Sequence, residues 1–153
     1  MDKTILYVNN FNFNEGKSVD KFMKNKIGII EDSIKKLKDR NYTNDEMKDF
    51  KNFQYISINM EKIITSILDL TTNFINSKNI KINSQPENIF RELYKNKIID
   101  EDMVSVIEEV LSFRYISLEN SKEADVDSIK KIIENKINYT LEYAYIISSN
   151  TIA

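Results

Sequence analysis

Arg114 is the residue of this sequence with the clearest potential for chemistry. Arginine is scarce, with 3 in 153 residues, and Arg114 ends the apolar context of residues 110–113. A guanidinium in such surroundings needs an anionic or carbonyl partner. One interpretation is structural, with Glu119 or a carbonyl at the end of a helix as the partner. The other is recognition of a phosphate group by the planar fork of N–H donors, and the residues alone favour the structural partner.

Several classes of active site are excluded by composition. The sequence has no histidine and no cysteine, which rules out imidazole acid–base chemistry, cysteine nucleophiles, disulfides and thiolate zinc sites. Gly16 and Gly28 stand alone, so no glycine-rich loop is available to hold phosphates. The acids at 100–102 and 108–109 point in different directions on a helix, where they cap or face solvent. We therefore expect no metal and no cofactor.

Three tyrosines near the end of the chain, Tyr139, Tyr143 and Tyr145, could in principle stack on the bases of a single strand. Only three lysines lie close to them in the sequence, at 130, 131 and 136, and the formal net charge of the chain is −2. A global attraction to nucleic acid or to an anionic membrane is not expected at this charge. Core packing or a subunit interface is the preferred interpretation of these rings.

The elements that must position these side chains are predicted to be helices. Only 2 glycines and 1 proline occur, which leaves few turn residues for a many-stranded sheet. Apolar residues recur instead at steps of three and four. This pattern predicts helices over about residues 19–40, 43–74, 86–94, 101–114 and 126–148. The fold class is therefore all-α, an antiparallel five-helix bundle of residues 17–153, with residues 1–16 as an N-terminal arm or a short strand.

Two capping boxes mark predicted helix starts. Thr43 with Glu46, and Ser84 with Glu87, have the spacing at which a hydroxyl and a carboxylate satisfy free backbone N–H groups. The first predicts the start of the long second helix. The second predicts the start of the third helix, with Pro86 just inside it, where a missing N–H is tolerated.

The longest stretches without a charged residue, 4–14 and 143–153, have 11 residues each. This is short of the roughly 18 apolar residues that a membrane-spanning helix needs. The start of the sequence also lacks the pattern of a signal peptide. We therefore expect no membrane association and a cytoplasmic location.

The run NKIIDEDMVSVIEEVLSFR, residues 96–114, resembles the HepT-like branch of the HEPN superfamily, small all-helical bacterial toxins. The resemblance also covers the first predicted helix, the stretch at 67–70 and the helix at 86–93. It spans residues 22–147, and it implies an HEPN-type bundle in a toxin–antitoxin or defence system.

Members of this family are typically homodimeric RNases with an arginine and a histidine from each subunit in a composite cleft. They are commonly neutralised by a nucleotidyltransferase-type antitoxin that can modify a nearby tyrosine. The resemblance places Arg114 at the motif arginine. Glu119 stands where the histidine is expected, Tyr115 stands where an asparagine is usual, and Ser121 stands at the modifiable tyrosine.

These departures predict a catalytically degenerate protein. RNA cleavage without a metal needs a base and an acid that titrate near neutral pH. An exposed Glu119, with an ordinary pKa near 4.3, is a weak base and repels the phosphate. Our leading hypothesis is a protein that dimerises through the faces around the fourth and fifth helices and binds an antitoxin, a related toxin subunit or RNA.

Two alternatives stay open from the sequence. In the first, the protein is an active RNase toxin that uses Arg114 and Glu119, with Tyr115 as the acid. In the second, it is a regulator from a phage or mobile element that reuses the HEPN scaffold to block a host nuclease. Residues 1–16, which the resemblance does not cover, are the place to look for such a nuclease partner.

Overall fold

The computed structural model describes residues 18–82, 88–116 and 123–153, and these residues are almost entirely helical. The predicted arm at residues 1–16 lies outside the described residues. The α-helices are α2 (Ser18–Lys38), α3 (Asn44–Lys48), α4 (Phe50–Ser77), α5 (Ile89–Lys95), α6 (Glu101–Leu111), α7 (Glu123–Lys131) and α8 (Asn138–Ile152). A 3-10 turn, η2 (Ser112–Tyr115), lies between α6 and α7, and a π-helical turn, η3 (Ile132–Lys136), lies between α7 and α8.

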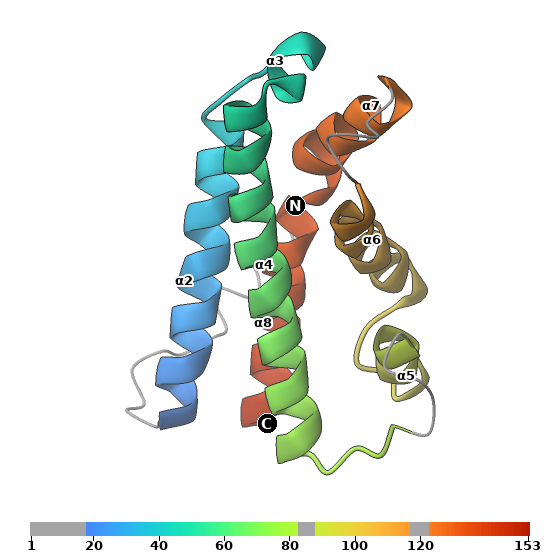
Figure 1. The fold of residues 1–153 in the computed structure, drawn as a ribbon. Coiled ribbons are helices and arrows are strands. Elements are labelled where there is room, and N and C mark those ends of the chain that lie inside the picture. Colours follow the sequence, from blue (N-terminus) through green and yellow to red (C-terminus); the bar gives the residue numbers. More distant parts are fainter. Residues whose placement is uncertain (1–17, 83–87, 117–122) are drawn as a thin grey trace.

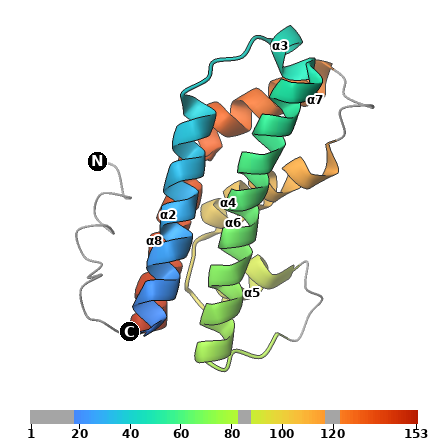
Figure 2. The same cartoon turned by 60° about the vertical axis from the view of Figure 1, so that its left-hand side comes forward.

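Three long helices form the centre of the molecule. α2, α4 and α8 all pack against one another. α2 runs antiparallel to α4 and α8, which share a direction (Figure 1). This arrangement is possible because α5, α6 and α7 follow one another along one side of the long helices and return the chain to the end where α3 lies (Figure 2). The all-α bundle predicted from the sequence is confirmed.

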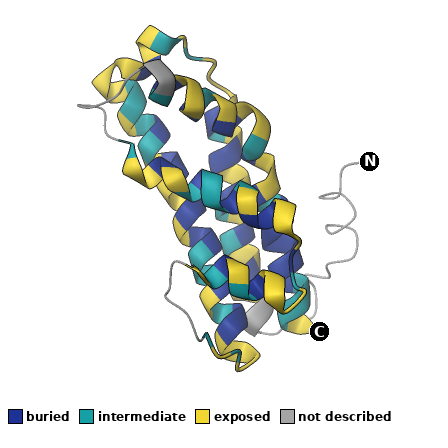
Figure 3. Cartoon of the chain, turned by 90° about the vertical axis from the view of Figure 1, so that its right-hand side faces the viewer, coloured by how far each residue is buried: buried dark blue, intermediate teal, exposed yellow. Residues whose placement is uncertain are grey.

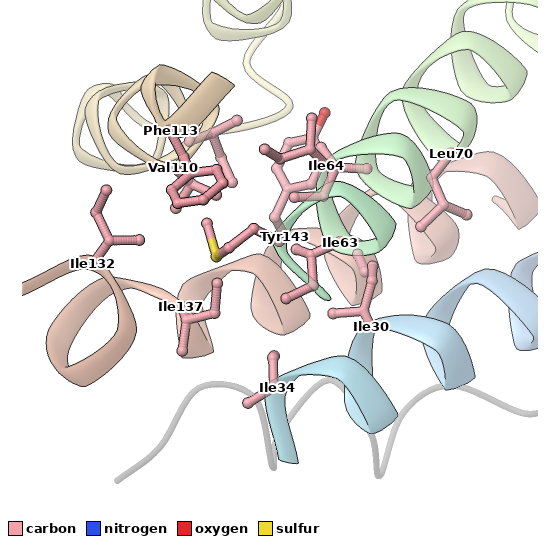
Figure 4. Close-up of a cluster of buried hydrophobic side chains, with 14 of the residues drawn as sticks. Ile30, Ile34, Ile63, Ile64, Leu70, Val110, Phe113, Ile132, Ile137 and Tyr143 are labelled. Carbon is pink, nitrogen blue, oxygen red and sulfur yellow. The ribbon is translucent and has the colours of Figure 1, made fainter. Parts of the chain in front are cut away.

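The apolar periodicity of the sequence corresponds to the core. The apolar residues that recur at steps of three and four along α4 are mostly buried. Those of α2 are all buried, namely Met23, Ile27, Ile30, Ile34 and Leu37. Figure 3 shows buried positions lining the inner faces of the helices and exposed positions outside. Figure 4 shows side chains from α2, α4, α6, η2, η3 and α8 meeting in one cluster. Its labelled members are Ile30, Ile34, Ile63, Ile64, Leu70, Val110, Phe113, Ile132, Ile137 and Tyr143.

The second predicted helix is two helices in the structure. The capping box at Thr43 is present, with Thr43 Oγ1 accepting from the Glu46 N–H at 3.2 Å, but it opens the short α3. Asp49 then takes an extended conformation, with ψ at 132°, and its carboxylate accepts from the Asn52 N–H to cap α4. Asn52 Nδ2 in turn donates to the Glu46 carbonyl at 2.9 Å. These side chains compete with the helical backbone for its partners, and the helix breaks there.

The fifth predicted helix is also interrupted. It consists of α7, η3 and α8, and within η3 the Ile137 N–H donates to the Ile132 carbonyl at 2.8 Å, five residues back. A π turn of this kind accommodates one extra residue within a helix. The predicted capping box at Ser84 and Glu87 lies outside the described residues, and α5 begins at Ile89.

Among the residues that the structure describes, no helix combines the length and the apolar character needed to cross a membrane. The same ranges contain no group of three or more side chains arranged to hold a metal ion.

Candidate functional site

The turn that carries Arg114 is fixed to α4 by an aromatic contact. Phe113 is buried, and its ring stacks on that of Phe53 with centroids 6.1 Å apart. Ser112 Oγ donates to the Glu109 carbonyl at 2.5 Å, and the Ile116 N–H donates to the Phe113 carbonyl at 3.0 Å. These bonds tie the turn to the last residues of α6 and close its own C-terminal end. η2 therefore lies against α4 in a defined orientation.

Arg114 faces Glu61 of α4 from this turn. Its Nε donates to Glu61 Oε2 at 3.2 Å, and its Nη2 donates to Glu61 Oε1 at 2.5 Å. Two parallel bonds of this kind match the fork of a guanidinium to both oxygens of one carboxylate. Thr65 Oγ1 also contacts Glu61 Oε1, at 3.5 Å. The guanidinium is thus held in place by a negatively charged group.

The structure therefore gives Arg114 a partner that the sequence analysis did not name. The structural interpretation named Glu119, which lies outside the described residues, or a helix-terminal carbonyl, and the partner that the structure shows is Glu61. The scarcity of acidic residues on α4 could have indicated Glu61 as the partner. α4 carries only two acids along its whole length, Glu61 and Asp69, and each pairs with a cation from another element, Asp69 with Lys26 at 2.8 Å.

The pair lies in a shallow hollow of about 350 Å³ between α4 and η2. Tyr115 follows Arg114 and is 89% exposed, and Ile58 on α4 is 50% exposed. Arg114 and Tyr115, two of the predicted site residues, therefore lie next to each other on the surface. Glu119 and Ser121 lie outside the described residues. The hollow is lined by Gln54, Ser57, Ile58, Glu61, Phe113, Arg114 and Ile116.

The three tyrosines do not gather into a stacking surface. Tyr143 is fully buried and meets Phe90 edge to face, with centroids 5.8 Å apart. Its hydroxyl lies 2.5 Å from Thr71 Oγ1. Tyr145 is also buried and donates to Glu31 Oε1 at 2.9 Å. Tyr139 alone of the three is exposed. The core interpretation is confirmed for Tyr143 and Tyr145.

Comparison with solved structures identifies the fold. A tri-AMPylated Shewanella oneidensis HEPN toxin in complex with MNT antitoxin has 16% sequence identity and a TM-score of 0.71, over 84% of this chain and 97% of that chain. A mutant of the toxin–antitoxin pair MntA-HpeT also has 16% identity and a TM-score of 0.71, over 84% of this chain and 98% of that one. A toxin–antitoxin with AMP-PNP has 16% identity and a TM-score of 0.69, over 82% of this chain and 97% of that chain.

These likenesses show that the chain has the HepT-like HEPN fold, as the sequence resemblance predicted. They span nearly the whole of the matching toxin chains. No protein-family model and no curated protein matches the sequence.

Proposed function

We propose that this protein is a HepT-like component of a toxin–antitoxin or defence system that acts by binding and has lost RNA cleavage. Of the solved neighbours named above, one is an HEPN toxin in complex with MNT antitoxin and another is a mutant of a toxin–antitoxin pair, which supports a role of this type. The observation that carries the loss of RNA cleavage is the pairing of Arg114 with Glu61.

The pairing opposes phosphate binding at Arg114. A carboxylate and a phosphate engage a guanidinium through the same two-bond geometry, so RNA would have to displace Glu61. The freed carboxylate would stay close and would repel the incoming phosphate. The chain also has no histidine to act as base or acid. Tyr115 is the one predicted site residue described beside Arg114, and a phenol is a weaker acid catalyst at neutral pH than the histidine it would have to replace.

The surface beside the hollow favours a protein partner. Ile58 and Tyr115 are large, exposed and close to an arginine, and aromatic residues with arginine are enriched at the centres of interfaces. We propose that this face binds a second copy of the chain and that a nucleotidyltransferase-type antitoxin binds the resulting dimer. α8 contributes little to such a face, because its residues 142–148 are all buried. Light scattering at micromolar concentration is expected to give a dimer, and a strict monomer would contradict this part of the proposal.

The decisive experiment is an RNA cleavage assay on the full chain. Wild type, Arg114→Ala and Glu119→His are incubated with mixed RNA, and Arg91→Ala serves as control because Arg91 also pairs with an acid, Glu108, on the surface. We expect no cleavage by wild type. Cleavage by wild type that disappears in Arg114→Ala but not in Arg91→Ala would identify an active nuclease using Arg114 and Glu119, and would overturn the proposal.

Glu61→Gln adds a test of the inhibitory carboxylate. The amide keeps the size of the side chain and removes its negative charge. Combined with Glu119→His, it is expected to give more cleavage than Glu119→His alone, because Arg114 is then free to hold a phosphate. Equal activity of the two variants would show that Glu61 does not compete with RNA. Growth arrest on expression of wild type would favour the active-toxin alternative.

A further inference from the structure

Residues of α2, α3, α4, α7 and η3, together with the connection after α2, line a second cavity. α3 and α7 meet at this end of the bundle, near the start of α4 (Figure 2). It has a volume of about 390 Å³, within the usual range for small-molecule sites. From α4 it takes Tyr55 and Ile56, whereas the Arg114 hollow takes Gln54, Ser57, Ile58 and Glu61. The two sites therefore share no residue.

The lining of this cavity combines apolar and basic side chains. Its apolar members, among them Leu37, Met47, Ile56 and Ile133, are buried. The charged lining residues are three cations, Lys38, Arg40 and Lys130, and one acid, Glu134. The local charge is positive although the chain as a whole is formally −2.

The three cations have no acidic partner within the described ranges. Six ion pairs are resolved there, and none of them includes Lys38, Arg40 or Lys130. The contrast is sharpest for the arginines, because the other two in the sequence, Arg91 and Arg114, are each paired with a carboxylate. Uncompensated positive charge around a cavity attracts an anion.

Arg40 is held in position by two tyrosines. Its guanidinium carbon lies 4.1 Å from the centre of the Tyr55 ring, and its Nη1 donates to Tyr42 Oη at 3.0 Å. These contacts orient the guanidinium, and the bond to Tyr42 uses one of its five N–H donors. Planar guanidinium and tyrosine groups are the surfaces on which nucleic-acid bases stack.

The π turn contributes to the same cavity. Ile133 and Glu134 belong to η3, and π turns within α-helices occur frequently at functional sites. The turn places an apolar residue and an acid next to each other in the cavity lining. Glu134 is an acceptor available for the amino group of a base or for a ribose hydroxyl.

We propose that this cavity binds a nucleoside phosphate, either as a free nucleotide or as the end of an RNA strand. The base stacks against the Arg40 and Tyr55 platform, Lys38 and Lys130 hold the phosphate, and Glu134 accepts a hydrogen bond from the base or sugar. This proposal is independent of the function proposed for the Arg114 hollow, because it uses other residues.

The test is isothermal titration calorimetry on the full chain with 5′-AMP, ADP and a 5′-phosphorylated RNA trinucleotide. Inorganic phosphate and adenosine are titrated separately. We expect at least one nucleotide ligand to bind about tenfold more tightly than phosphate or adenosine, because base and phosphate are recognised together. Preference for AMP or ADP over the trinucleotide would identify a free nucleotide as the ligand, and the reverse an RNA end. Equal binding of inorganic phosphate, or no binding at millimolar concentration, would overturn the proposal.

Amino-acid substitutions test whether the nucleotide binds in this cavity. Arg40→Ala is expected to weaken nucleotide affinity about tenfold, and Arg40→Lys to restore only part of it, because lysine keeps the charge without the planar fork. Arg91→Ala is the matched control and should bind as wild type does. Circular dichroism confirms that each variant is folded. Unchanged affinity in Arg40→Ala, or loss of binding in Arg114→Ala, would place the ligand elsewhere and contradict the proposal.

Discussion

The ion pair between Arg114 and Glu61 positions the Arg114 guanidinium more than it stabilises the fold. The two side chains keep 38% and 51% of their exposure. In such surroundings water screens the attraction, and pairs of this kind contribute about 0–1 kcal/mol to stability. The rigidity of η2 on α4, which comes from Phe113, matters more for where the guanidinium points.

Arg114→Ala is therefore expected to lower the free energy of unfolding by less than about 1 kcal/mol. Urea denaturation of wild type, Arg114→Ala, Glu61→Ala and the double variant measures both the losses and the coupling between the two residues. The coupling should also stay below about 1 kcal/mol. A loss above about 2 kcal/mol in Arg114→Ala would show that the arginine is structural, and any functional defect of that variant would then need another explanation.

The residue scale also shows what the sequence could predict of the site. Arg114 was identified because an arginine after an apolar run is unusual in a chain with so few of them. Glu61 was missed because it lies 53 positions away, and only the packing of η2 on α4 brings the two together. The platform of Arg40 and Tyr55 was missed for the same reason, since a helix packing arrangement and not a motif creates it.

At the scale of elements, the sequence predicted the existence of helices better than their ends. The buried faces of α2 and α4 follow the apolar periodicity closely. The break at Asp49 was not predicted, because the apolar pattern gives no sign of side chains that take over backbone hydrogen bonds. The π turn at Ile132–Lys136 was missed because one extra residue shifts the apolar period only locally.

Phe113 is the side chain that joins η2 to α4, and its removal should be costly. Phe113→Ala is expected to lower the free energy of unfolding by about 3–5 kcal/mol, the usual loss for a buried phenylalanine. Phe50→Ala is the matched control, because Phe50 is 67% exposed and its loss should cost less than about 0.5 kcal/mol. Chemical denaturation measures both. Similar small losses in the two variants would mean that the stack on Phe53 does not anchor the turn.

At the scale of the whole molecule, two buried tyrosines of α8 tie the three central helices together. Thr71 donates its hydroxyl hydrogen to the Ile67 carbonyl at 2.7 Å, so Tyr143 is the donor in its bond to Thr71 on α4. Tyr145 donates to Glu31 on α2. Burial raises the pKa of Tyr143, and burial together with the bond to Glu31 and its charge raises the pKa of Tyr145. Both hydroxyl groups therefore stay protonated in the folded protein at pH values where the hydroxyl of a tyrosine in the unfolded chain, with a pKa near 10, loses its proton.

This difference predicts a stability that falls in alkali. Below about pH 10 the folded and the unfolded protein both keep these two protons, so the tyrosines add no pH dependence to stability. Above about pH 10 the unfolded chain releases the protons, and this release favours unfolding. The expected slope is about 1.4 kcal/mol per pH unit for each tyrosine. Urea denaturation between about pH 9 and pH 11.5 measures it. Tyr143→Phe should remove about half of the slope, and Tyr139→Phe, at an exposed position, should leave it unchanged. An unaltered slope in Tyr143→Phe would show that alkaline unfolding begins elsewhere than between α4 and α8.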